Sequence, residues 1–97
     1  MLTTAQTSIV RNVLQQVIPG ATVRVFGSRA TGHARPFSDL DLLVLDPPHL
    51  SWEQFADLRD LFETSDLQFR VDVVESAALP AGIAERVRFE SIPLPDR

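Results

Sequence analysis

The sequence predicts an α/β protein, α+β in some classification schemes, in which a small sheet of three to four strands packs against about three helices. Segments rich in β-branched and aliphatic residues alternate along the chain with segments of helical periodicity. The chain has 97 residues, 44% of them hydrophobic and 23% charged. This length accommodates one hydrophobic core and therefore a single domain over residues 1–97.

The first predicted element is an amphipathic helix that begins after Thr3. Thr3 and Gln6 have the spacing of a capping box, and Pro19–Gly20 ends the helix. Its apolar stripe has i, i+4 spacing: Ile9, Val10, Val13, Leu14, Val17, Ile18. Residues 21–26 (ATVRVF) then have the β-branched content of a strand, which stops at Gly27.

Residues 39–45 (DLDLLVL) predict a second strand that lies in the middle of the sheet. Nearly every position after Asp41 is apolar, as expected of a strand that is covered on both faces. The link between the first two strands, residues 27–38, contains no obvious long helix. We therefore expect this link to be the functional loop.

A second helix is predicted from Ser51, which forms a capping box with Gln54, to about residue 64. We expect Trp52 and Phe55 to pack in the core rather than to stack on a nucleotide base.

The remaining elements are a third strand, a short helix and an edge strand. The third strand covers roughly residues 68–75 and carries Asp72 among aliphatic residues. The helix covers about residues 81–90, and residues 92–94 add a short edge strand.

Charge and composition exclude several classes of function. The net charge is -4, which disfavours direct nucleic-acid binding. All nine basic residues are arginine, so a lysine-based P-loop is excluded. No apolar run approaches the about 20 residues of a membrane helix. The chain has no cysteine and no signal-peptide pattern, so we expect a cytoplasmic protein without a membrane partner.

Three carboxylates form the candidate catalytic and metal-binding set. Asp39 and Asp41 are two residues apart on a predicted strand, so they point to the same face. Two carboxylates so close repel each other unless a cation lies between them, and Mg²⁺ is bound by carboxylates together with substrate phosphates. Asp72 lies in an aliphatic strand, where a buried unpaired charge would be costly. If this strand lies beside the second strand, Asp72 completes the set.

The candidate nucleotide-binding residues precede these carboxylates. Gly27 at the end of the first strand lets the backbone approach a ligand closely, and Ser28 offers a hydroxyl and free N–H groups to an anion. Arg29 either contacts phosphate or pairs with a nearby carboxylate, and Arg35 and His33 in the following loop either reach the nucleotide or face solvent.

The order Gly-Ser, ten residues, Asp-x-Asp, and a lone aspartate on a later strand resembles the DNA polymerase beta-like nucleotidyltransferase superfamily. Within it, nearly the whole chain resembles the minimal nucleotidyltransferases, or MNT domains. The resemblance rests on these residues: Gly27, Ser28, Arg29, Asp39, Asp41, Asp72. It implies the nucleotidyltransferase fold with a mixed sheet, and transfer of a nucleoside monophosphate to a hydroxyl with release of pyrophosphate.

The resemblance also implies roles for these residues. Asp39 and Asp41 hold two Mg²⁺ ions, while Asp72 binds the acceptor-side ion and helps to deprotonate the hydroxyl. Gly27, Ser28 and Arg29 hold the β and γ phosphates.

Minimal nucleotidyltransferases accompany HEPN-domain proteins, so the resemblance further implies a toxin–antitoxin pair. In such a pair the antitoxin transfers AMP from ATP to the toxin, usually to a tyrosine, and blocks its RNase activity. This chain contains no tyrosine, which excludes tyrosine self-modification. Two alternatives stay open: an antitoxin that acts by binding alone, and the catalytic subunit of a small-molecule nucleotidyltransferase. The sequence leaves open which nucleoside triphosphate is used and whether the protein forms homo- or hetero-oligomers.

Overall fold

Helices and strands alternate along the chain in the computed structural model, which describes residues 2–95. Within this range the elements are α1 (Thr4–Val17), β1 (Thr22–Phe26), α2 (Ser28–Thr31), β2 (Leu40–Asp46), α3 (Trp52–Glu63), β3 (Val71–Glu75), the 3₁₀ turn η1 (Ser76–Ala78), α4 (Ala81–Glu90) and β4 (Ile92–Pro93). The described part has four α-helices where about three were predicted, because the start of the loop after β1 forms the one-turn helix α2.

The sheet is mixed and has the strand order β3-β2-β1-β4. Strand β1 is antiparallel to both β2 and β4, whereas β2 and β3 run parallel. Strand β2 is therefore internal, as predicted, and β3 is an edge strand. Strand β3 begins at Val71 rather than at residue 68, because the chain is still irregular at Phe69, whose side chain turns inward and is buried.

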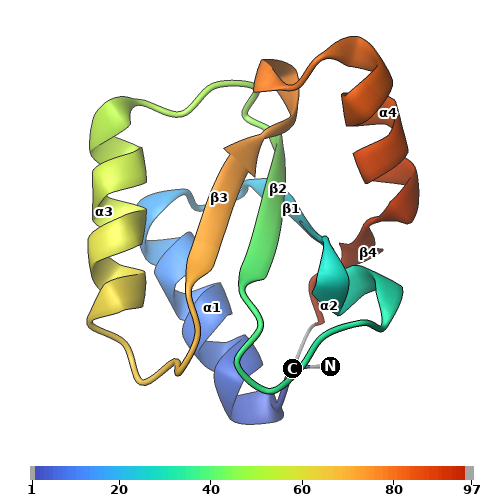
Figure 1. Cartoon of the computed structure of the whole chain (residues 1–97). Helices are drawn as coiled ribbons and strands as arrows, with labels where there is room; N and C mark the ends of the chain where they lie inside the picture. Colours follow the sequence, from blue (N-terminus) through green and yellow to red (C-terminus); the bar gives the residue numbers. More distant parts are fainter. Residues whose placement is uncertain (1, 96–97) are drawn as a thin grey trace.

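The helices form two layers, one on each side of the sheet. Helices α1 and α3 cover one face, while α2 and α4 lie on the opposite side (Figure 1). On β2, Leu40, Leu42 and Val44 are fully buried in the core that the sheet forms with α1 and α3. Side chains of a strand alternate between faces, so Asp41 points away from this core.

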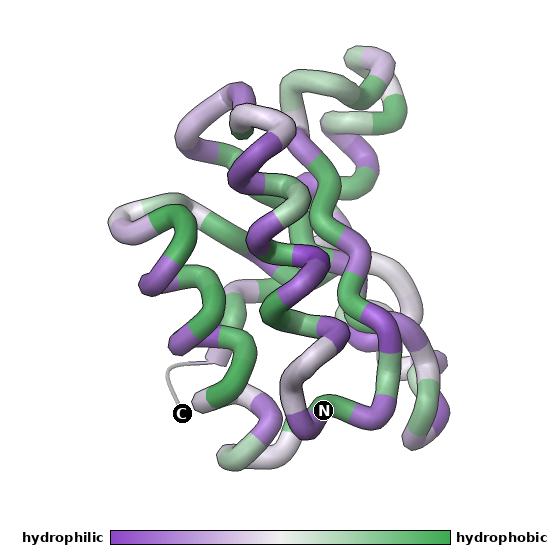
Figure 2. The backbone as a smooth tube through the Cα atoms, turned by 90° about the vertical axis from the view of Figure 1, so that its left-hand side faces the viewer, coloured by the Kyte–Doolittle hydropathy of each residue, from purple (hydrophilic) through white to green (hydrophobic). Residues whose placement is uncertain are grey.

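The two longest helices begin as the sequence predicts. Both predicted capping boxes form, Thr3 with Gln6 at α1 and Ser51 with Gln54 at α3. Along these helices hydrophilic and hydrophobic residues alternate, as expected of helices with one face on a core (Figure 2). No helix in residues 2–95 combines the length and the hydrophobicity needed to cross a membrane.

The prediction that Trp52 packs in the core is wrong. Trp52 is the first residue of α3 and is 78% exposed. Leu58 and Phe62, further along the same helix, are the α3 residues buried in the core, and Phe55 is partly buried against it. An exposed tryptophan at the edge of a helix is available for binding a partner.

Candidate active site

Asp39 and Asp41 lie at the beginning of β2 but differ in exposure. Strand β2 begins at Leu40, so Asp39 is the last residue of the preceding loop and is exposed. Asp41 lies within the strand and is half-buried. The strand therefore fixes the backbone of Asp41, while the position of Asp39 depends on the loop before it.

Asp72 lies directly beside Asp41 in the sheet. In the parallel pair β2–β3, Asp41 and Asp72 are register partners, so their side chains share one face. The Asp72 side chain is 41% exposed, and its Oδ1 atom lies 3.2 Å from the Arg70 guanidinium. The sequence-based condition that the third strand should lie beside the second is thus fulfilled.

Gly27 brings the end of β1 against the same carboxylate. Phe26 and Asp41 are register partners, and the chain turns sharply at Gly27, with φ 75° and ψ -153°. A side chain is essentially not tolerated in this backbone conformation. A Cβ atom on Gly27 would overlap Asp41 Oδ2 and lie 3.2 Å from Asp41 Cγ. Ser28 then begins α2, next to this contact.

The carboxylates interact electrostatically. Burial raises the pKa of Asp41 above its usual value, and the negative charges of Asp72 and Asp39 raise it further. The three predicted carboxylates thus create an excess of negative charge around Asp41. A divalent cation bound by oxygen ligands would relieve this repulsion, so the donor set is chemically suited to Mg²⁺.

The carboxylates do not form a closed metal cage. Within residues 2–95, no three side chains of His, Cys, Asp or Glu are close enough together to hold a metal ion. This arrangement is compatible with an ion that takes its remaining ligands from substrate phosphates and water, which is the usual form of a Mg²⁺ site. Metal binding by Asp39, Asp41 and Asp72 stays a prediction.

Arg29 is buried beside the site and connects several of its segments. Its side chain is 9% exposed, and its guanidinium donates hydrogen bonds to the carbonyl of Ser38 at 2.8 and 3.1 Å and to the carbonyl of Pro36 at 3.3 Å. The guanidinium also lies over the ring of Phe69, 4.2 Å from its centroid. Burial lowers the pKa of Arg29, although such a strong base stays charged.

Arg29 therefore connects α2, the loop that ends at Asp39 and the segment before β3. This contact with backbone carbonyls was not foreseen from the sequence, which offered phosphate or a carboxylate as partners. A direct contact between Arg29 and phosphate stays a prediction. The burial of Phe69, one residue before Arg70, was equally unforeseen.

The other predicted loop residues are solvent-exposed. Arg35 and His33 both lie in the exposed stretch between α2 and β2. The backbone N–H of Arg35 donates to Ser38 Oγ, and His33 Nδ1 lies 3.0 Å from Thr31 Oγ1. These contacts order the loop locally, and a nucleotide contact for Arg35 stays a prediction.

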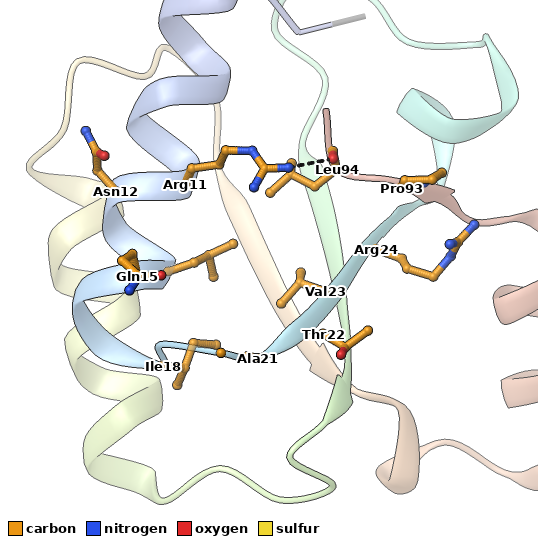
Figure 3. Close-up of a pocket in the computed structure, with 12 residues that line it drawn as sticks. Arg11, Asn12, Gln15, Ile18, Ala21, Thr22, Val23, Arg24, Pro93 and Leu94 are labelled. Carbon is orange, nitrogen blue, oxygen red and sulfur yellow. Dashed lines mark hydrogen bonds between the residues drawn. The ribbon is translucent and has the colours of Figure 1, made fainter. Parts of the chain in front are cut away.

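Two hollows adjoin Asp72, and a third lies elsewhere. The two hollows, of about 540 and 450 Å³, are both lined by Arg59, Val71 and Asp72. A separate hollow of about 490 Å³ lies between α1, β1 and β4, where Arg11 donates a hydrogen bond to the Leu94 carbonyl (Figure 3). Its lining contains none of the predicted site residues, whereas the two hollows beside β3 contain one of them, Asp72.

Comparisons with known proteins identify the family to which the chain belongs. Residues 8–94 match the family model described as "Nucleotidyltransferase domain". The chain is 38% identical over 81 residues to "Probable protein adenylyltransferase MntA" of Haemophilus influenzae (strain ATCC 51907 / DSM 11121 / KW20 / Rd), an alignment that covers 84% of this chain and 71% of that protein.

Two solved structures share the fold. One is assigned to a minimal nucleotidyltransferase, with a TM-score of 0.70, 39% identity, and coverage of 93% of this chain and 90% of the other. The second is a chain from a toxin–antitoxin crystal structure with AMP-PNP, with a TM-score of 0.73, 23% identity, and coverage of 94% and 73%.

Proposed function

Since the chain belongs to the nucleotidyltransferase domain family, we propose that it transfers a nucleoside monophosphate, AMP from ATP, to a hydroxyl group of a partner protein. One observation carries this proposal: the turn at Gly27 directly follows β1, and Asp41 and Asp72 lie on the next two strands of the sheet, β2 and β3. The proposed site thus has a phosphate-binding end, a metal-binding centre and an acceptor end in one line across the sheet.

In this proposal each residue has a defined role. The Gly27–Ser28 turn binds the β and γ phosphates through backbone N–H groups and the serine hydroxyl. Asp39, Asp41 and Asp72 would hold two Mg²⁺ ions, which would supply charge stabilisation for the entering and leaving oxygens. Asp72 accepts the proton of the acceptor hydroxyl, whose oxygen bonds to the α-phosphorus as the bond to pyrophosphate breaks. Arg29 keeps Asp39 in place by holding the carbonyl of Ser38.

The proposal also specifies the acceptor protein and the nucleotide donor. A relative is named a probable protein adenylyltransferase, and a chain of the same fold occurs in a toxin–antitoxin structure with AMP-PNP. These relatives support a toxin protein as the acceptor and ATP as the donor. We expect the toxin to be of the HEPN type and the reaction to take place in the cytoplasm.

The experiment that tests the proposal compares two positions of a radioactive label. The protein is incubated with Mg²⁺, the protein encoded beside it, and ATP labelled at either the α or the γ phosphate. We expect label from α-labelled ATP to appear on the neighbouring protein and label from γ-labelled ATP to remain in pyrophosphate. Transfer should be lost in the variant Asp39→Asn/Asp41→Asn and when Mg²⁺ is chelated.

A matched control is Asp57→Asn, because Asp57 is an exposed carboxylate on α3 outside the site. This variant should transfer at the wild-type rate. If no label reaches the neighbour while the wild type and the double variant bind it equally well, the protein acts by binding alone. If label passes only to a small molecule, the acceptor part of the proposal is wrong.

A further inference from the structure

The proposed site ends at an open edge of the sheet. Gly27 directly follows β1, Asp41 lies on β2, and Asp72 lies on the edge strand β3. With phosphates bound at the β1 end, the β3 side is the open side of the site next to Asp72. The surface beyond β3 is therefore a candidate for binding the acceptor.

The outer side of β3 offers unpaired backbone groups. The Leu40 N–H donates to the Arg70 carbonyl at 2.8 Å, so Arg70 directs its backbone groups toward β2. Successive residues of a strand direct these groups to opposite sides. The N–H and C=O groups of Val71 and Val73 consequently point outward, away from β2. Such a row of donors and acceptors is complementary to another extended polypeptide.

A groove for side chains runs beside this edge. The two hollows at Asp72 are bounded by β3 and α3, and the smaller is lined by Trp52, Phe55 and Val73. Val71 pairs with Leu40 in the register and so faces the α3 side, whereas Asp72 faces the opposite side with Asp41. The edge thus combines a groove of mixed polarity, with apolar side chains beside Trp52, on one face and the proposed catalytic carboxylate on the other.

We propose that the acceptor is an extended segment of the partner protein that pairs with β3 as an added strand. This inference rests on the proposed function and specifies how its substrate binds. The residue opposite Asp72 carries the hydroxyl, because directly opposed side chains share a face with Cβ atoms about 4.5–5.5 Å apart. Its neighbours in sequence point to the other face, where apolar side chains fill the groove beside Trp52.

A polypeptide fits this edge better than the other classes of acceptor. A nucleic acid has no backbone N–H groups to pair with the strand, and it would meet the protein's net charge of -4. Such a segment also supplies two independent elements of recognition, the backbone pairing and the side chains in the groove.

Amide hydrogen exchange tests the backbone pairing. In the complex between this protein and its neighbouring protein, the amides of Val71 and Val73 should become protected, whereas that of Asp72 is already protected in the free protein. Unchanged exchange at Val71 and Val73 in a complex that transfers AMP would overturn the proposal. Protection in the free protein that grows with concentration would also overturn it, because the edge would then pair with a second copy of this chain.

Trp52→Ala tests the groove, and Phe89→Ala is its matched control. Both aromatic side chains are highly exposed, at 78% and 89%, so neither substitution should disturb folding; Phe89 lies on α4. We expect Trp52→Ala to raise the KM for the acceptor about tenfold, with the KM for ATP unchanged. Phe89→Ala should change neither value.

The outcomes separate this inference from the proposed function. If the wild type transfers no AMP to any protein, the proposed function fails and the inference fails with it. If the wild type transfers AMP and Trp52→Ala has the same acceptor KM as Phe89→Ala, the docking site is wrong while the proposed function stands.

Discussion

Replacing Gly27 with alanine should strongly slow transfer while leaving the protein folded. The backbone at Gly27 has φ 75° and ψ -153°, a conformation that only glycine adopts without strain. The added Cβ would overlap Asp41 Oδ2 and crowd Asp41 Cγ at 3.2 Å, but its distance to Asp41 Cβ, 3.5 Å, is an ordinary contact. The carboxylate therefore has to rotate away, whereas the β2 backbone can stay in place.

The magnitude follows from these two effects. Backbone strain at a positive φ should lower the free energy of unfolding by about 1–3 kcal/mol. The displaced carboxylate should lower kcat by on the order of 100-fold, since small misplacements of catalytic groups have effects of this size. Urea unfolding measures the first quantity, and the transfer assay with α-labelled ATP measures the second.

Gly20→Ala is the matched control for this substitution. Gly20 has nearly the same φ, 78°, but a Cβ added there meets nothing within 4 Å. The control should lose a similar amount of stability and keep its transfer rate. If Gly27→Ala keeps wild-type kcat, or if both variants lose activity in proportion to stability, the contact between Gly27 and Asp41 has no role in catalysis.

Three further substitutions test the remaining interactions. Arg29→Lys keeps the charge but loses the paired donors to Ser38 and the stacking on Phe69, so urea unfolding should show a loss of about 1–3 kcal/mol; unchanged stability would argue against this role. The pKa of Asp41 is raised in the folded protein. Ionisation of Asp41 therefore destabilises the metal-free fold at pH values above the raised pKa. This destabilisation disappears as the pH falls below the ordinary value of 3.8. Thermal unfolding should thus show a higher midpoint for Asp41→Asn than for wild type at pH 7 and no difference at strongly acidic pH; a lower midpoint at pH 7 would contradict this reasoning. Thr7 is fully buried and its Oγ1 has no hydrogen-bond partner, so Thr7→Val should raise the free energy of unfolding by about 1 kcal/mol in the same urea assay, and a decrease would indicate an unseen partner.

Local sequence signals predicted most of the elements, because they depend on neighbouring residues. The capping boxes at Thr3 and Ser51 mark helix starts that the structure confirms. The aliphatic run after Asp41 correctly indicated an internal strand, since only a strand covered on both faces is apolar at successive positions. The interpretation required Asp72 to lie beside Asp41, and the register of β2 and β3 pairs these two residues.

Features that depend on distant contacts could not be predicted in this way. The burial of Arg29 depends on Phe69, forty residues further along the chain, and on a carbonyl of the loop before Asp39. Trp52 has the apolar character of a core residue but lies at the exposed start of α3. Hydrophobicity alone does not distinguish a core tryptophan from one that is exposed for binding.

Intact-mass spectrometry of the neighbouring protein tests the central claim most directly. That protein is incubated with ATP and Mg²⁺ in the presence of the wild type or of Asp39→Asn/Asp41→Asn. We expect the wild type alone to add the mass of an adenylyl group, with one pyrophosphate released for each group added. An unchanged mass with the wild type, or a gain that corresponds to phosphate alone, would contradict the assignment of a protein nucleotidyltransferase.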